Sequence, residues 1–388
     1  MKSHRNERPK ILFLFSDTGG GHRSASEALI EALDLEFPGQ FDTEMVDIFR
    51  NAPSPMHLAI PTYPMFAQVP SIWEISYSIF DGRRRVIIAN SMLSPYMRQY
   101  YEKLIAAHPS DVIVSCHPVP ISSFIDILEE TERSQRPPFI TVVTDLVTTP
   151  AFWYDKRADM IVVPTEQARV RGVKLGVPNE LFEVIGLPVA DRFCHPTADR
   201  RAIRERLGWP QDLPMILIVG GGEGMGPIGK NALAIDKARL PAGVAVVCGR
   251  NKRLKERLEK HDWSIPAYMY GFVREMPDFM AAADVLVTKA GPGTISEAFI
   301  SGIPLLLYSR MPGQEDGNVA YVMEEGAGIW APQPRLVVQA LREWLYNPEK
   351  RAAAGRASLR LAKPEAARQI ARLIAASIGI DHPAGEKE

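Results

Sequence analysis

The same local pattern opens both halves of the chain: an apolar run, a glycine-rich turn and a helix. Residues 11–15 (ILFLF) lead through SDTGGGH into a predicted helix over 24–35, where apolar residues recur at helical spacing. Residues 215–219 (MILIV) lead into GGGEGMG in the same way. A strand that feeds a glycine turn and a helix begins an α/β unit with a parallel sheet. The sequence therefore predicts two doubly wound α/β domains.

Short β-rich runs alternate with helical stretches through both halves, as a parallel sheet covered by helices requires. Further strands are expected at 111–115, 139–144, 160–163, 244–248, 267–270, 284–288 and 304–308. A polar, proline-containing stretch lies between the halves. We therefore expect an N-terminal domain over 1–190 and a C-terminal domain over 191–363. Residues 364–388 contain an amphipathic helix that is expected to pack back on the N-terminal domain.

Composition excludes several classes of protein. The 388 residues carry 45 Lys or Arg and 46 Asp or Glu, a net charge of -1, whereas a general nucleic-acid binder has a basic excess. The three cysteines, Cys116, Cys194 and Cys248, lie far apart, which argues against a disulfide framework or a structural zinc site and fits a reducing cytosol. No apolar run is long enough for a signal peptide or a membrane span. A soluble or membrane-surface protein is expected.

Residues 51–101 interleave prolines with aromatic side chains, among them Trp73, and a cluster of Arg83, Arg84 and Arg85 follows the aromatics. From 50 to 103 there are six Lys or Arg and three Asp or Glu, a local excess of three positive charges. Aromatic and apolar groups beside a basic cluster suit the headgroup layer of an anionic membrane. A helical insertion packed in the core, with its arginines in water, explains the pattern equally well.

Two glycine-rich turns in the second half have the features of an anion site. Glycine lets the backbone approach a ligand, and a helix that starts after the turn favours a phosphate. Neither turn matches a P-loop or a G-x-G-x-x-G motif, which disfavours nucleoside triphosphate hydrolysis and a standard dinucleotide site. The candidate residues in these turns are Gly221, Gly222, Gly224, Gly291, Gly293 and Thr294.

Polar residues near these turns could bind the rest of a nucleotide sugar. Glu297, one turn into the helix after the second glycine turn, is placed to accept hydrogen bonds from ribose; the alternative is a surface carboxylate near a helix start. Gln314, Glu315 and Asn318 follow a strand, and ligands of open α/β sheets bind at that end. A simple cap and turn would need fewer polar groups, so the sequence favours a sugar site here.

His22 is the candidate general base. It follows a run of glycines that includes Gly20 and Gly21, at the C-terminal end of the first strand, and is expected to face an interdomain cleft. Histidine near its ordinary pKa of ~6.5 can take a proton from a hydroxyl group. Asp145, at the end of another strand, could orient His22 or contact the acceptor, or could only cap the next segment.

No metal or other cofactor is expected, because the chain has no Asp-x-Asp pair and its histidines form no ligand cluster. The charge of a departing pyrophosphate would then fall to backbone amides, helix dipoles and Arg250. A solvated arginine at a helix start is an almost equal alternative for Arg250.

Five motifs together resemble the monogalactosyldiacylglycerol synthase family: SDTGGGHRSASEAL, GGGEGMGP, CGRNK, TKAGPGTISEA and PGQEDGN. They occur in order between about residues 11 and 330. The resemblance implies the GT-B fold, with two Rossmann-like domains that face a cleft. It also implies an inverting transfer of galactose from UDP-galactose to diacylglycerol, in which His22 deprotonates the acceptor hydroxyl.

The same resemblance implies roles for the other candidates. The two glycine turns would hold the UDP phosphates, Glu297 the ribose, and Gln314, Glu315 and Asn318 the hexose. The N-terminal domain would lie on the cytoplasmic face of an anionic membrane and collect the lipid. Candidate acceptor or membrane contacts are Gly20, Gly21, Trp73, Arg83, Arg84, Arg85 and Trp153. A core position is the simpler alternative for Trp153.

Three rival functions remain at this stage. The donor could be UDP-glucose, because the two sugars differ in the orientation of one hydroxyl. A UDP-sugar 2-epimerase has the same two-domain plan but uses no lipid. A noncatalytic nucleotide-sugar sensor would bind UDP-sugar without turnover. The sequence has no long N-terminal extension, so we expect no chloroplast transit peptide and a bacterial origin.

Overall fold

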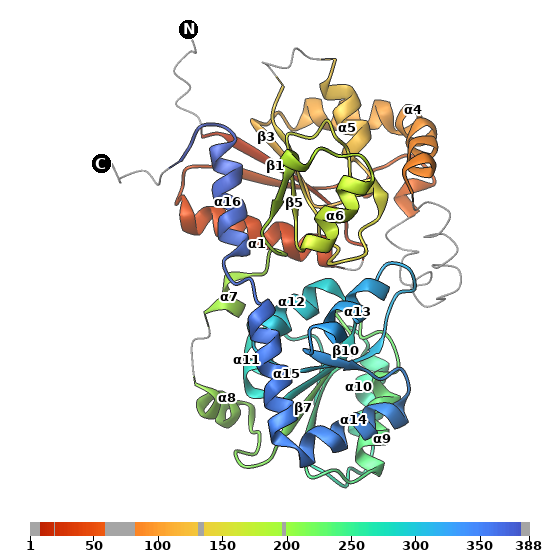
Figure 1. The fold of residues 1–388 in the computed structure, drawn as a ribbon, viewed down its shortest axis with the longest axis vertical. Coiled ribbons are helices and arrows are strands. Elements are labelled where there is room, and N and C mark those ends of the chain that lie inside the picture. Colours follow the sequence, from red (N-terminus) through yellow and green to blue (C-terminus); the bar gives the residue numbers. More distant parts are fainter. Residues whose placement is uncertain (1–7, 19, 59–81, 131–135, 196–198, 382–388) are drawn as a thin grey trace. The chain divides into compact units, whose positions relative to one another are not determined.

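A computed structural model describes all residues except 1–7, 19, 59–81, 131–135, 196–198 and 382–388. The chain divides into two compact units (Figure 1). Unit 1 comprises Met1–Asp191 and Glu365–Glu388, and unit 2 comprises Arg192–Pro364. The predicted membrane contact Trp73 lies outside the described residues, as does the side chain of Arg83.

Unit 1 is built on a six-stranded parallel sheet with the strand order β2-β1-β3-β4-β5-β6. The strands are β1 (Lys10–Phe15), β2 (Asp42–Asp47), β3 (Val112–Ser115), β4 (Phe139–Val142), β5 (Met160–Val163) and β6 (Phe182–Val184). Because all strands run the same way, the loops that follow them meet at one edge of the sheet. That edge holds the first candidate site.

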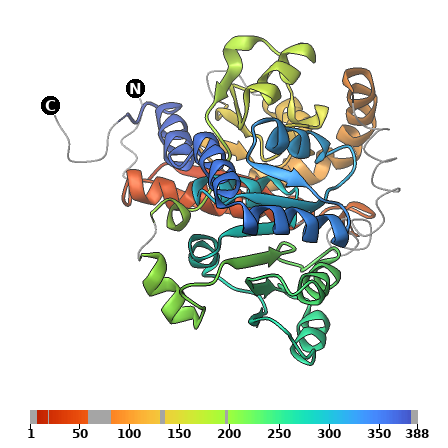
Figure 2. The same cartoon turned by 60° about the horizontal axis from the view of Figure 1, so that its bottom comes forward.

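Helices cover both faces of this sheet. They are α1 (Gly21–Glu36), α4 (Arg83–Ala107), α5 (Ile121–Leu128), α6 (Glu166–Lys174) and α16 (Ala366–Ala376), with η1 (Met56–Leu58), η2 (Ala151–Trp153) and η3 (Asn179–Leu181). Alternate residues of β1 point into two cores: Leu12 packs with α4 and α5, and Phe13 packs with α1 and α16. Helices α1 and α16 lie side by side in both ribbon views (Figures 1 and 2). Arg368 of α16 pairs with Glu36 and Asp191.

Unit 2 repeats the plan with the strand order β12-β11-β10-β7-β8-β9, again all parallel. The strands are β7 (Met215–Val219), β8 (Gly243–Val247), β9 (Ala267–Tyr270), β10 (Val285–Lys289), β11 (Leu305–Ser309) and β12 (Gly328–Trp330). The helices are α7 (Asp191–Cys194) at the boundary, α8 (Arg200–Leu207), α9 (Ile228–Lys237), α10 (Lys252–Glu259), α11 (Met276–Ala282), α12 (Pro292–Ile300), α13 (Asp316–Glu324), α14 (Pro334–Tyr346) and α15 (Pro348–Leu361).

The two parallel sheets confirm the predicted fold class of two doubly wound α/β domains. Three strands were missing from the prediction, and all three lie at sheet edges: β2, β6 and β12. Edge strands of this kind lack the continuous apolar run that marks a central parallel strand; β2, for example, alternates between exposed and partly buried residues. Among the described residues, no helix combines the length and the apolar character that a membrane span needs.

Candidate functional site

His22 lies where β1 passes into α1. Gly20 caps this helix with φ at 79°, a left-handed conformation that glycine adopts without strain. The sharp turn points the first helical residues toward the loops after β3 and β4. As a result, Nδ1 of His22 lies 2.8 Å from Oγ1 of Thr144, and its ring centroid lies 4.6 Å from that of His117.

Burial keeps His22 uncharged at neutral pH. Loss of hydration lowers the pKa of His22 to about 4, although a backbone hydrogen bond with Cys116 acts in the opposite direction. Burial also lowers the pKa of His117 well below its ordinary value, and the neighbouring His22 adds to this effect. A neutral imidazole can accept a proton, so His22 is in the protonation state that its predicted role as a base requires.

The residue before Asp145, Thr144, contacts His22. One Asp145 oxygen accepts a hydrogen bond from the indole N–H of Trp153 at 2.7 Å, and its predicted role toward His22 or the acceptor stays a prediction. Trp153 is fully buried, with its ring centroid 6.1 Å from that of His22. This is the core position that the sequence left open for Trp153. The predicted contact of Trp153 with a lipid stays a prediction.

His117 and Thr144 are site residues that the sequence reasoning missed. His117 follows β3 by two residues, and Thr144 follows β4 by two. Since β1, β3 and β4 are neighbours in the sheet, the residues just past their ends gather around His22. The available signal was the SCHP sequence directly after a predicted strand. His117 accepts the Val119 backbone N–H on Nδ1 at 3.3 Å, which leaves its proton on Nε2.

The first glycine turn of unit 2 follows β7 and fits closely against the end of β8. Gly221 and Gly224 have positive φ angles of 71° and 61°. A Cβ atom on Gly224 would lie 1.9 Å from the carbonyl oxygen of Cys248, so only glycine fits there. Arg250 follows β8; it is mostly exposed, pairs with Glu223, and stacks 5.0 Å from the ring centroid of Phe272.

The second glycine turn follows β10 and starts α12. Gly291 is the cap of this helix, and as a glycine it has no side chain to cap the backbone N–H groups that follow at Gly293 and Thr294. Lys289, the last residue of β10, lies beside the turn, with Nζ 3.1 Å from Oε1 of Glu315. The sequence reasoning gave Lys289 no role, although Lys289 is part of the TKAGPGTISEA motif.

The remaining donor candidates lie around this second turn. Glu297 is a partly buried residue of α12, and burial raises its pKa to about 7. Gln314 is partly exposed, whereas Glu315 and Asn318 are buried and bond to the chain itself. Contacts of these three side chains with a hexose therefore stay predictions.

The N-terminal half of α4 carries an exposed stripe. Arg84, Ile88, Met92 and Tyr96 recur every fourth residue, so they share one face of the helix. Ile88 and Met92 are 60% and 73% exposed, unusual values for large apolar side chains. Two further exposed residues, Arg85 and Ile87, lie next to this stripe.

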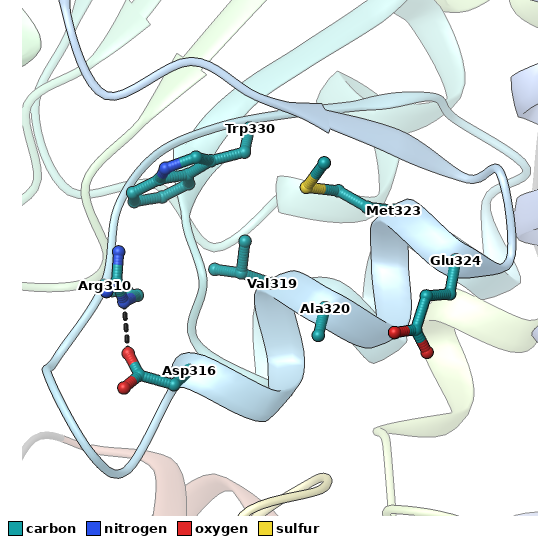
Figure 3. Close-up of a pocket in the computed structure, with 7 residues that line it drawn as sticks. All are labelled: Arg310, Asp316, Val319, Ala320, Met323, Glu324 and Trp330. Carbon is teal, nitrogen blue, oxygen red and sulfur yellow. Dashed lines mark hydrogen bonds and ion pairs between the residues drawn. The ribbon is translucent and has the colours of Figure 1, made fainter.

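Figure 3 shows an open pocket of about 510 Å³ between α13 and β12. Arg310 pairs with Asp316 there, and its guanidinium lies 5.1 Å from the Trp330 ring centroid. None of the glycine-turn residues lines this pocket. In the part of the chain that the structure describes, no group of three His, Cys, Asp or Glu side chains could hold a metal ion.

Comparison with known proteins places the chain in a family. The family model for monogalactosyldiacylglycerol (MGDG) synthase matches residues 22–189, and that for the glycosyltransferase family 28 C-terminal domain matches residues 215–370. Monogalactosyldiacylglycerol synthase 1 of Arabidopsis thaliana is 33% identical over 372 residues, which cover 93% of this chain and 69% of the relative. This chain belongs to the monogalactosyldiacylglycerol synthase family. The resemblance inferred from the motifs is thus confirmed.

Other members of the synthase family match to the same degree. Monogalactosyldiacylglycerol synthase 3 of Arabidopsis thaliana is 34% identical, with 92% of this chain and 78% of the relative covered. The synthase of Spinacia oleracea is also 34% identical, with 88% and 67% covered. All of these relatives are named as chloroplastic.

Solved structures confirm the GT-B arrangement expected for an MGDG synthase relative. The spinosyn rhamnosyltransferase SpnG is 15% identical with a TM-score of 0.61, covering 94% of this chain and 99% of its own. MurG of Acinetobacter baumannii is 16% identical with a TM-score of 0.58, covering 95% and 99%. A UDP-GlcNAc 2-epimerase of Neisseria meningitidis is 13% identical with a TM-score of 0.60, covering 95% and 99%. At these identities the likeness concerns the fold alone.

Proposed function

We propose that this protein is an inverting glycosyltransferase that moves galactose from UDP-galactose to diacylglycerol and forms monogalactosyldiacylglycerol. The observation that carries this proposal is the identity of 33–34% with synthases of that name over about nine-tenths of the chain. The partly buried, neutral His22 at the start of α1 is the base that such a transfer needs in this proposal.

His22 acts in this proposal as the general base. The acceptor oxygen attacks C1 of galactose while its proton passes to the imidazole of His22, and UDP departs from the opposite side of C1. The 2.8 Å contact with Thr144 and the neighbouring ring of His117 hold the imidazole in place. Asp145, tied to Trp153, is proposed to shape the acceptor side of the site.

The donor is proposed to bind unit 2. The turns at Gly221–Gly224 and Gly291–Thr294 present backbone N–H groups for the UDP phosphates, because glycine removes the side chains that would block their approach. Glu297 is the proposed ribose contact, and Gln314 the most accessible proposed hexose contact.

The exposed stripe of α4 is proposed to bind an anionic membrane surface from the cytoplasmic side. Ile88 and Met92 would enter the apolar part of the headgroup layer, while Arg84 and Arg85 would meet lipid phosphates. The pairing of exposed apolar and basic side chains on one helix supports a peripheral association. A lipid acceptor would then reach the enzyme from the bilayer.

A turnover assay with two donors tests this function. Diacylglycerol in anionic mixed micelles is offered with labelled UDP-galactose or UDP-glucose, and the sugar of the lipid product is identified. We expect product from UDP-galactose. Product from UDP-glucose alone would make the protein a glucosyltransferase, and no product from either, with UDP binding intact, would favour an epimerase or a sensor.

A further inference from the structure

Lys289 occupies an unusual position at the end of β10. Its side chain is largely buried, at 23% exposure, and Nζ lies 3.1 Å from Oε1 of Glu315. Glu315 itself is only 3% exposed. An ammonium group held at this depth loses hydration free energy. A role in binding an anion would explain why the fold keeps it there.

The side chain of Lys289 lies between the two glycine turns, with its ammonium group beside Gly291. A Cβ atom on Gly291 would be 3.0 Å from Nζ, and one on Gly221 would be 3.6 Å from Cε. These two turns follow β10 and β7, which are adjacent strands. Neither glycine has a side chain that would block an anion beside Lys289. Such an anion could therefore also accept hydrogen bonds from backbone N–H groups of both turns.

Two buried side chains of the α13 segment hold this arrangement. Oε2 of Glu315 accepts the backbone N–H of Met311 at 2.7 Å, while Oε1 meets Lys289. Asn318 donates from Nδ2 to the carbonyl oxygen of Ala290 at 2.9 Å, directly between Lys289 and Gly291. Its Oδ1 is buried and has no partner among the described residues, so it could accept a hydrogen bond from a donor group of the nucleotide sugar, such as a hydroxyl, but not from the diphosphate.

Arg250 is the alternative cation, and its surroundings differ. Its side chain is 64% exposed, pairs with Glu223 and stacks on Phe272. A guanidinium on a planar ring is suited to the edge of a nucleotide site rather than to its anionic centre. Lys289 is the more enclosed charge, and enclosure strengthens an interaction with an anion.

We propose that Lys289 binds the diphosphate of the nucleotide sugar and stabilises the charge on departing UDP, and that Glu315 and Asn318 are positioning residues for Lys289 and its turn. The inference rests on the proposed function for the donor, a UDP-sugar, and is independent of the acceptor.

The chemistry balances without a change at Lys289. A bond forms between the acceptor oxygen and C1, and the acceptor proton goes to His22. The bond between C1 and the β-phosphate oxygen breaks, and its electron pair leaves with UDP, which gains one negative charge. Lys289 stays protonated and donates to that oxygen, an interaction that grows as the charge develops.

Binding of UDP and uridine to the full chain tests the role of Lys289. Lys289→Met should weaken UDP binding at least ~10-fold, the scale of a lost charge-assisted hydrogen bond, and leave uridine binding unchanged. Lys289→Arg should keep most of the affinity. Lys237→Met, which removes an exposed charge from α9, is the matched control and should have no effect. Unchanged UDP affinity in Lys289→Met, or an equal loss of uridine binding, would overturn the proposal.

A second comparison separates Lys289 from Arg250 and tests the positioning residues. Arg250→Met should reduce the preference for UDP over uridine less than Lys289→Met does; the reverse order would move the role to Arg250.

Glu315→Ala should weaken UDP binding in the wild-type background but not in Lys289→Met, because Glu315 acts through the lysine. A Glu315→Ala variant that loses affinity for UDP-galactose but not for UDP would refute positioning and make Glu315 a hexose contact.

These outcomes are independent of the proposed transfer. If the protein binds UDP through Lys289 but transfers no sugar to diacylglycerol, the proposed function fails and this inference stands. If the protein makes the lipid product and Lys289→Met binds UDP normally, this inference fails and the proposed function stands.

Discussion

Nδ1 of His22 and Oγ1 of Thr144 lie 2.8 Å apart, a hydrogen bond between two residues 122 positions apart in the sequence. The bond joins the start of α1 to the loop after β4. It restricts the imidazole to one orientation.

Removal of this bond should slow the reaction without abolishing it. Thr144→Val keeps the shape of the side chain but cannot bond to His22, so we expect kcat to fall ~10-fold, with His22→Ala costing at least ~10²-fold. UDP affinity should not change in either variant. Thr144→Ser restores the hydroxyl and is the matched control. Full activity in Thr144→Val would show that the bond has no part in catalysis.

The low pKa of His22 predicts the acid side of the pH profile. A pKa of about 4 means that the base stays neutral, and therefore active, at pH values where an ordinary histidine is already protonated. At saturating UDP-galactose, kcat should be constant from pH 8 to about 5.5. A fall to half near pH 6.5 would show that His22 is an unperturbed histidine or that another group is the base.

The stripe on α4 predicts loss of membrane binding on substitution. Replacing Ile88 and Met92 by serine removes two exposed apolar side chains, each worth ~1–2 kcal/mol when buried in lipid, so vesicle affinity should fall at least ~10-fold. Replacing Arg84 and Arg85 by alanine should weaken binding to anionic vesicles and make it less dependent on salt. Leu35→Ser, an exposed residue of α1, is the control. Unchanged co-sedimentation of both α4 variants would reject this surface.

Metal removal should leave the rate intact. Backbone N–H groups, the start of α12 and a lysine are the proposed partners of the diphosphate, and none of them needs a divalent ion. Turnover should therefore be equal with EDTA and with added Mg²⁺ or Mn²⁺. Loss of activity in EDTA, restored by one of these ions, would contradict the mechanism.

The sequence predicted the parts of the fold that depend on local pattern. The glycine turns after residues 15 and 219 identified two α/β units, since a buried strand, a glycine turn and a helix form a contiguous signal. Helix α4 runs from Arg83 to Ala107 and includes Pro95. Proline usually ends a helix, so local pattern alone does not place the start of α4 before Pro95.

Contacts between strands could not be predicted in the same way. Lys289 ends β10 and Glu315 follows β11, and their 3.1 Å contact depends on the order of these two strands in the sheet. The position of His117 next to His22 depends likewise on β3 lying beside β1. For Trp153 the sequence left a lipid contact and the simpler core position open, and its hydrogen bond to Asp145 appears only in the folded chain.

The anomeric configuration of the lipid product tests the central claim most directly. Incubation of the full chain with UDP-galactose and diacylglycerol should give a galactolipid whose anomeric proton has the large coupling of a β-linkage, because attack opposite the leaving UDP inverts the α-linkage of the donor. An α-linked product would contradict inversion and a role for His22 as the base, and an unchanged diacylglycerol pool would contradict the acceptor.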